Sequence, residues 1–96
     1  MSTTISSDGL EPRRKKALFR AWHRGTKEMD FVFGTFADAH LAGLGEADLA
    51  DFERLLDVGD QELFSWIVGS IPVDPIHDRP VWAAILAHTA TTDKVT

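Results

Sequence analysis

MDFVFGTFADAH, residues 29–40, carries the clearest structural signal in this chain of 96 residues. Its apolar side chains recur at intervals of three and four residues, which is the spacing of one face of an α-helix. The apolar stripe comprises Met29, Val32, Phe33, Phe36 and Ala37, and His40 lies at its end. Gly43 and Gly45 follow, and glycine disfavours the continuation of a helix. The pattern therefore predicts a helix that ends near His40.

The same helical spacing continues on the N-terminal side of this stretch. Pro12 suits the first turn of a helix, where its missing N–H costs nothing. Leu18, Ala21 and Trp22 then form an apolar stripe opposite a basic face. Gly25 stands where a helix commonly ends. The sequence therefore predicts a first helix between Pro12 and Gly25.

Three further helices are predicted on the C-terminal side. A third ends at Gly59, a fourth spans Asp60–Val68 with Asp60 as its N-cap, and a fifth follows a cap at Asp78. The side chains expected to face inward are Leu49, Phe52, Leu55 and Leu56, then Leu63, Phe64, Ile67 and Val68, then Val81, Trp82, Ile85 and Leu86.

The pattern as a whole predicts an all-α fold, a single small bundle of about five short helices. No alternating Val/Ile/Thr-rich run predicts a strand. Residues 1–10 are rich in Ser and Thr and lack periodicity, so we expect a flexible N-terminal arm. Residues 11–90 would form the five-helix domain, and residues 91–96 a flexible tail.

Composition excludes several classes of function. Without cysteine there is no disulfide, thiolate nucleophile or cysteine-ligated metal. No apolar run approaches the roughly 18 residues of a membrane-spanning helix, so we expect no membrane insertion. The first residues lack the basic start and the apolar stretch of about 7–15 residues of a secretory signal. We therefore expect a cytoplasmic protein.

The sequence contains no recognisable catalytic, metal or cofactor site. None of the five serines lies in a glycine-rich elbow, and no two of the four histidines are spaced as a helical metal pair. No glycine-rich loop has the context of a dinucleotide site. We therefore expect no catalytic residues, no metal and no cofactor signature, and a protein that is not an enzyme.

The charge is strongly polarised. The net charge is −5, but residues 1–30 hold seven Lys/Arg against four acids, and residues 31–96 hold three against eleven. Four of the bases form the run Arg13–Lys16, which would suit a small helical nucleic-acid-binding or regulatory, antitoxin-like module. The acidic pI of about 5.2 and the shortness of the run favour a solvated helix end instead. We therefore expect no nucleic-acid partner, and a basic end that steers association with an acidic partner surface.

The corner His23-Arg24-Gly25-Thr26-Lys27-Glu28-Met29-Asp30 is the strongest candidate for a contact site. A tight glycine turn would display Arg24 and Glu28 together, as a guanidinium donor and a carboxylate acceptor. The alternative is purely structural: Gly25 ends one helix, and Glu28 faces the positive N-terminus of the next. The residues alone support both interpretations equally. Trp66, which is offset from its helix stripe, is a second candidate contact because it would be partly exposed.

This corner resembles the hallmark of a known family, the succinate dehydrogenase assembly factors or flavinators (the SdhE type in bacteria). The hallmark is Arg-Gly-x-x-Glu followed soon by Asp, and it stands here over residues 24–30. Arg13–Lys16 and Trp22 resemble the family's first helix, and residues 52–57 and 60–66 resemble its second block. The likeness covers about residues 13–72. It departs at Gly59-Asp60-Gln61, where many members have an Asp-Pro type of helix cap.

The resemblance implies a non-catalytic chaperone of five helices. It implies a partner, the flavoprotein subunit of succinate dehydrogenase or, in some bacteria, of fumarate reductase, and a role in the covalent attachment of FAD to that subunit. The FAD would belong to the partner. The residues that would contact the flavoprotein are Arg24, Gly25 and Glu28, flanked by His23 and Asp30, with Trp66 as a further contact. If so, alanine at Arg24 or Glu28 would leave the melting temperature nearly unchanged.

Overall fold

The computed structural model describes residues 10–95, with side chains through residue 90. The elements are α1 (Pro12–Trp22), α2 (Lys27–His40), the 3-10 turn η2 (Leu41–Gly43), α3 (Glu46–Leu56), α4 (Asp60–Val68), the 3-10 turn η3 (Pro75–His77) and α5 (Pro80–Val95). No strand occurs among the described residues. The prediction of an all-α fold with five helices is confirmed.

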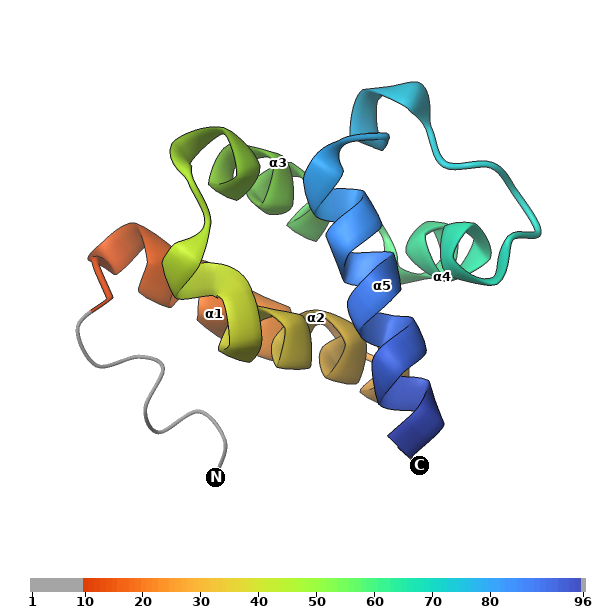
Figure 1. The fold of residues 1–96 in the computed structure, drawn as a ribbon, viewed down its shortest axis with the longest axis horizontal. Helices are drawn as coiled ribbons and strands as arrows, with labels where there is room; N and C mark the ends of the chain where they lie inside the picture. Colours follow the sequence, from red (N-terminus) through yellow and green to blue (C-terminus); the bar gives the residue numbers. More distant parts are fainter. Residues whose placement is uncertain (1–9, 96) are drawn as a thin grey trace.

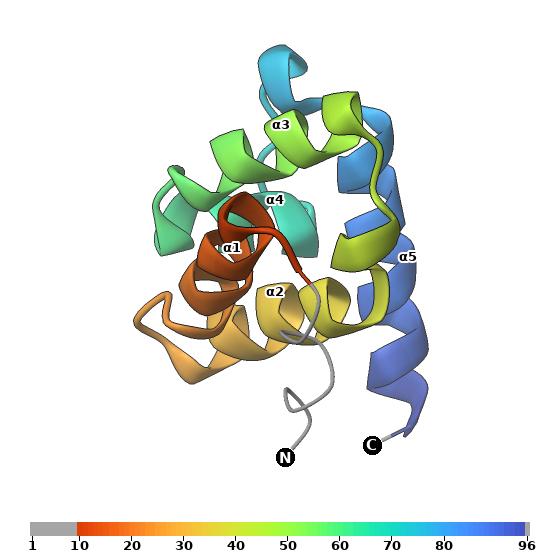
Figure 2. The same cartoon turned by 90° about the vertical axis from the view of Figure 1, so that its left-hand side faces the viewer.

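The five helices enclose one core. α1 packs along α2, α3 lies across both, and α5 runs diagonally over α2 and α3 (Figure 1). α4 begins beside the turn that follows α1, since Asp60 at its first position pairs with Arg24, and Figure 2 shows α4 behind α1. The view from the side shows α1 in front of α2, with α5 along the edge of the molecule (Figure 2). The turn between α1 and α2 and the turn between α3 and α4 therefore come close together, although more than 30 residues of chain separate them.

Some helix ends differ from the prediction. The N-cap of α4 is Gly59 and makes no side-chain cap bond, so the predicted cap at Asp60 is wrong. Asp78 follows η3 and is not the cap of α5, because the carbonyl of Arg79 accepts the bond from the N–H of Trp82 at 2.9 Å. α5 continues to Val95, past the predicted boundary at residue 90. Of the predicted arm, residues 1–9 lie outside the described residues, and Leu10 packs against the core.

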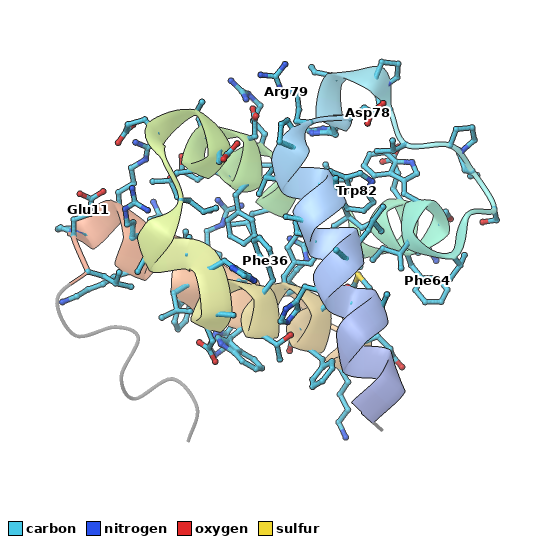
Figure 3. All side chains as sticks on the ribbon, viewed as in Figure 1. Glu11, Phe36, Phe64, Asp78, Arg79 and Trp82 are labelled. Atoms are coloured by element: carbon cyan, nitrogen blue, oxygen red, sulfur yellow. The ribbon has the colours of Figure 1, made fainter. Side chains whose placement is uncertain are left out.

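Aromatic rings form the centre of the core. Phe36 of α2 lies 5.7 Å from the ring of Phe52 in α3, and Phe33 lies 5.9 Å from the same ring. Figure 3 shows Phe36 pointing inward between the helices. The largest side chains with almost no exposed surface are Phe33, Phe36, Phe52, Leu41, Leu49, Leu55, Leu63 and Ile85. The stripe that predicted α2 is thus the stripe that packs against α3.

Gly34 allows α1 and α2 to approach closely. A Cβ atom at this position would lie 2.2 Å from Cδ2 of the Trp22 ring. The ring is held in place, because its Nε1–H donates to Oδ1 of Asp38 at 3.2 Å. A side chain at residue 34 would therefore push the two helices apart.

We expect Gly34→Ala to destabilise the protein by about 1–3 kcal/mol, the usual cost of overpacking. Helix propensity alone predicts the opposite sign, a gain of about 1 kcal/mol from replacing a glycine inside a helix. Urea unfolding decides between the two. Gly43→Ala is the control, because a Cβ atom at Gly43 meets nothing within 4 Å. A stabilised Gly34→Ala protein would show that the helix contact is loose.

Two histidines meet beside the core. The ring of His88 in α5 lies edge-on to His40, with centroids 5.7 Å apart, and its Nε2 lies 3.2 Å from Oγ1 of Thr35. Burial lowers the pKa of His88 below its ordinary value of 6.5, and the nearby charge of His40 lowers it further. The folded protein therefore holds His88 neutral at pH values where the unfolded chain is protonated.

Protonation of His88 makes the stability of the fold depend on pH. Because the unfolded state binds more protons, stability is complete above the ordinary histidine pKa of about 6.5 and is lost as the pH falls below it. We expect the free energy of unfolding to fall as the pH decreases from about 7 to about 5.5. Carboxylates titrate at lower pH than this range. Urea unfolding across this range should give a smaller slope for His88→Gln. An equal slope in the variant would show that His88 does not cause the pH dependence.

Candidate functional site

The turn between α1 and α2 is held closed by Asp30. One carboxylate oxygen, Oδ1, accepts hydrogen bonds from the backbone N–H of Arg24 at 2.5 Å and of Gly25 at 3.2 Å. Gly25 has a φ of 129°, a conformation that other residues rarely adopt. Thr26 caps α2 by accepting from the N–H of Met29 at 3.3 Å. The sequence did not point to this cap, and Asp30, predicted as a contact residue, closes the turn.

The guanidinium of Arg24 joins this turn to the turn between α3 and α4. Its Nε donates to Oδ1 of Asp60 at 2.7 Å, and its Nη1 donates to the carbonyl of Leu56 at 2.8 Å. Its Nη2 donates to the carbonyl of Val58. The same group lies over the ring of Phe33, 5.2 Å from the ring centre. All three nitrogens of the guanidinium are therefore used inside the protein.

The predicted exposure of Arg24 is wrong. Only 6% of its side chain is exposed, and its partner Asp60 is 19% exposed. A buried guanidinium needs a carboxylate and further acceptors to offset the loss of water. Asp60 therefore neutralises Arg24 instead of capping α4. Arg24 and Glu28 are not displayed together on the surface.

Glu28 is the exposed acceptor of the corner. It lies in the first turn of α2, where the helix dipole favours a carboxylate. Its side chain makes no hydrogen bond or ion pair with the rest of the described chain. It also lies at the border between two neighbouring surface hollows. Of the two charged residues of the motif, Glu28 is the one available to a partner.

The two hollows form one groove between α2 and α4. Their volumes are about 480 and 260 Å³, and they share Glu28, Met29 and Phe64. We call this the Glu28 groove. The exposed apolar side chains along it are Phe31, Phe64 and Val68, with 45%, 48% and 57% of their surface exposed. The predicted inward positions of Phe64 and Val68 are therefore wrong, and both contribute to a surface that the sequence did not indicate.

The remaining predicted contact residues differ in accessibility. His23 is exposed and stacks on Phe19, with ring centroids 4.0 Å apart. Trp66 is only 7% exposed and meets Trp82 edge to face at 5.9 Å, so the predicted partial exposure of Trp66 is wrong. Trp82 lies among the packed side chains of α5 (Figure 3). Trp66 belongs to the core, and it is not available to a partner in this conformation.

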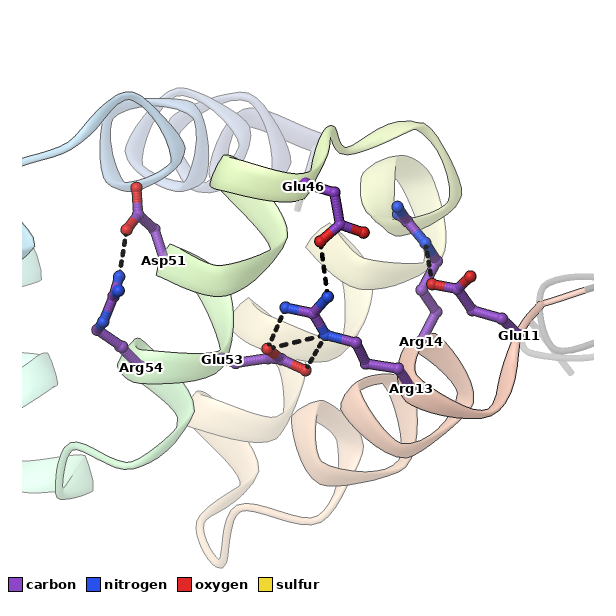
Figure 4. A network of polar contacts seen from close by, with 7 residues as sticks. All are labelled: Glu11, Arg13, Arg14, Glu46, Asp51, Glu53 and Arg54. Atoms are coloured by element: carbon purple, nitrogen blue, oxygen red, sulfur yellow. Dashed lines mark hydrogen bonds and ion pairs between the residues drawn. The ribbon is translucent and has the colours of Figure 1, made fainter.

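Much of the predicted basic patch is engaged within the protein. Arg13 forms ion pairs of 2.8 Å with both Glu46 and Glu53 of α3 (Figure 4). The hydrogen bond to Glu53, and to a lesser extent the one to Glu46, raises the pKa of Arg13. The hydrogen bond from Arg13 lowers the pKa of Glu53. Arg14 donates to Glu11 and to the carbonyl of Leu41. These contacts tie α1 to its neighbours, which weakens the expectation that the run steers association.

The described residues, 10–95, offer neither a metal site nor a membrane-spanning helix. No group of three or more His, Cys, Asp or Glu side chains is placed to hold a metal ion there. None of the helices in that range is long and apolar enough to cross a membrane. The Glu28 groove places an exposed charged group beside exposed apolar side chains.

Comparison with known proteins identifies one family. A family model described as the flavinator of succinate dehydrogenase matches residues 15–89. The FAD assembly factor SdhE of Acetobacter pasteurianus is 38% identical over 69 residues, which are 72% of this chain and 63% of that protein. The mitochondrial succinate dehydrogenase assembly factor 2 of Dictyostelium discoideum is 32% identical over 82% of this chain and 56% of its own length.

The chain matches less than two thirds of the length of each of these relatives. A similar factor from Mycosarcoma maydis is 34% identical over 70% of this chain, but over only 28% of its own length. No solved structure matches the chain. The matched residues, 15–89, extend from α1 into α5 and include the Arg24–Asp30 corner and the Glu28 groove.

Proposed function

The chain belongs to the flavinator family of succinate dehydrogenase, and on this basis we propose that it is an assembly factor for the flavoprotein subunit of that enzyme. It binds this subunit and promotes the covalent attachment of FAD to it. The observation that carries the proposal is the match of the family model over residues 15–89, which covers nearly the whole helical core. Fumarate reductase, which the sequence resemblance also implies, would be served through the same contact.

The contact surface in this proposal is the Glu28 groove. The Glu28 carboxylate accepts hydrogen bonds from the flavoprotein, while Phe31 and Phe64 supply apolar area around it. Aromatic residues are enriched at protein interfaces, and a charged group that meets its complement across an interface adds specificity. Gly25 is exposed and directly precedes Thr26, which lines the groove, so it extends the contact; His23 is exposed as well but lines a separate hollow with Phe19 and Arg20, beside the groove's turn.

Arg24 acts indirectly. By joining the α1–α2 turn to the α3–α4 turn, it fixes α2 relative to α4 and therefore holds the two walls of the groove. It is a positioning residue, and Asp30 and Asp60 are its partners in that role. Both charged residues of the motif thus contribute to binding, one through contact and one through the shape of the groove.

The chain supplies no bond-forming group in this proposal. The flavoprotein holds FAD and provides the residue that becomes linked to it. An assembly factor accelerates such a step by holding the reacting groups in the correct relative position, an effect that can contribute several kcal/mol. The chemistry of the bond remains that of the flavin.

Reconstitution from purified components tests the proposal. The apo-flavoprotein is incubated with FAD, with and without the chain, and flavin that stays attached after acid precipitation is followed over time. We expect the chain to raise the rate of attachment and to form a complex with the apo-flavoprotein during gel filtration. Equal rates with and without the chain, and no complex, would refute the assembly role.

The nucleic-acid alternative has less support. Arg13 and Arg14 use their guanidinium groups for ion pairs and hydrogen bonds within the protein. Lys15 and Lys16 remain exposed, and two lysines on one helix turn provide few phosphate contacts. DNA binding that decreases steeply with rising salt would support nucleic-acid binding as the function instead.

A further inference from the structure

A buried carboxylate on another face of the molecule holds two exposed arginines. Asp51 of α3 has only 9% of its side chain exposed. Its Oδ1 accepts from Nη1 of Arg54 at 2.5 Å, and its Oδ2 accepts from Nε of Arg79 at 3.1 Å. Figure 4 shows the pair of Asp51 and Arg54, and Figure 3 shows Arg79 where α5 begins. One carboxylate therefore orients two guanidinium groups that are 25 residues apart in sequence.

Both guanidinium groups keep most of their donors for other partners. The side chains of Arg54 and Arg79 are 57% and 54% exposed, and each uses one nitrogen for Asp51. No other hydrogen bond or ion pair of either group occurs among the described residues. Arg13 and Arg24 differ, because their guanidinium nitrogens are all bonded. Two guanidinium charges share one carboxylate, so the group of Arg54, Arg79 and Asp51 carries a net positive charge.

Arg54 and Arg79 lie in the acidic part of the sequence. Residues 31–96 contain only three basic residues against eleven acids, and two of the three are Arg54 and Arg79. They border a surface hollow of about 380 Å³, whose other lining residues are Asp51, Pro75 and Ile76. Ile76 is 64% exposed, the highest value among the large exposed hydrophobic residues. The hollow shares no residue with the Glu28 groove.

We propose that the hollow formed by Arg54, Arg79 and Ile76 is a second docking point, which binds a carboxylate side chain in an acidic, apolar-flanked segment of a protein partner. The exposed guanidinium nitrogens donate to the carboxylate, and Ile76 and Pro75 contact the apolar neighbour of that residue. The proposal concerns another face and does not depend on the proposed function of the Glu28 groove.

The openness of the hollow favours a protein segment over a free small anion. Sites for small molecules usually enclose most of the ligand surface, whereas both arginines here are more than half exposed. Such a surface binds firmly only when a partner covers the hydrogen bonds and excludes water around them. A side chain carried by a protein segment brings that cover with it, and a free carboxylate does not.

Nuclear magnetic resonance titration of the full chain tests the proposal. The probe is the acetylated and amidated peptide Leu-Glu-Glu-Leu, and its neutral counterpart is Leu-Gln-Gln-Leu. We expect the acidic peptide to shift the Nε–H signals of Arg54 and Arg79 and the amide signal of Ile76 in a saturable manner. The neutral peptide should leave them unchanged. Equal shifts with both peptides, or none with the acidic peptide, would overturn the proposal.

Variants separate binding from stability. Arg54→Gln and Arg79→Gln each leave one arginine on Asp51, and each should weaken peptide binding by about tenfold, equivalent to about 1.4 kcal/mol. Arg20→Gln is the matched control, because Arg20 makes one exposed ion pair with Asp57 and has no second guanidinium beside it. If both Arg54→Gln and Arg79→Gln bind the peptide as well as the unmodified chain does, the two arginines serve only to neutralise Asp51.

Discussion

Replacing Arg24 with alanine is expected to destabilise the protein by about 3–5 kcal/mol, the usual cost of removing one partner of a buried ion pair, and not to leave the melting temperature nearly unchanged as the predicted exposure of Arg24 implied. The change would leave Asp60 without its cation, and the carbonyls of Leu56 and Val58 without their donor. Since small domains are stable by only about 5–15 kcal/mol, much of the protein would unfold on mild heating. Urea unfolding followed by circular dichroism measures the loss.

Two further variants make this result specific. Arg20→Ala removes an exposed ion pair with Asp57 and should cost only about 0–1 kcal/mol. Arg24→Lys keeps the charge but cannot reach three acceptors with the same geometry, so its stability should lie between the two alanine variants. An Arg24→Ala protein within about 1 kcal/mol of the unmodified chain would mean that the guanidinium does not join the two turns.

Replacing Glu28 with glutamine is expected to have the opposite profile. Stability should change by less than about 0.5 kcal/mol, because the side chain is exposed and makes no hydrogen bond or ion pair in the described chain. Binding to the flavoprotein should weaken by about tenfold to a hundredfold, because a hydrogen bond to a charged group contributes about 1.5–3 kcal/mol. Isothermal titration with the purified apo-flavoprotein measures the change.

The matched control for this variant is Glu62→Gln. Glu62 lies in the first turn of α4, is exposed like Glu28, and does not line the Glu28 groove. The Glu62→Gln substitution therefore removes the same charge from a neighbouring part of the surface. Equal losses of affinity in the two variants would indicate a general effect of net charge and would count against a specific contact at Glu28.

The sequence predicted the helices because their stripes are local. Met29, Phe33 and Phe36 define one face of α2 regardless of what covers it, and that face is buried in the structure. The role of Arg24 could not be found in this way. Its acceptors, the carbonyls of Leu56 and Val58, are backbone atoms more than 30 residues away, and no side-chain pattern marks them.

α4 shows a second limit of reasoning from periodicity. Its apolar residues fit two faces, since Leu63 and Ile67 combine with either Trp66 or Phe64 at helical spacing. The structure turns Trp66 inward against Trp82 and leaves Phe64 half exposed beside Glu28. The packing partner on α5 therefore decides which face is buried, and with it the composition of the groove.

We propose that this chain promotes covalent flavin attachment through Glu28, on a surface held by Arg24. The most direct test uses a strain that lacks the chain, in which denatured proteins are separated on a gel and the flavin fluorescence of the flavoprotein band is measured. We expect a weak band without the chain, full recovery with the unmodified chain or Glu62→Gln, and poor recovery with Glu28→Gln at equal protein level. A band of undiminished fluorescence in the strain without the chain would contradict this proposal.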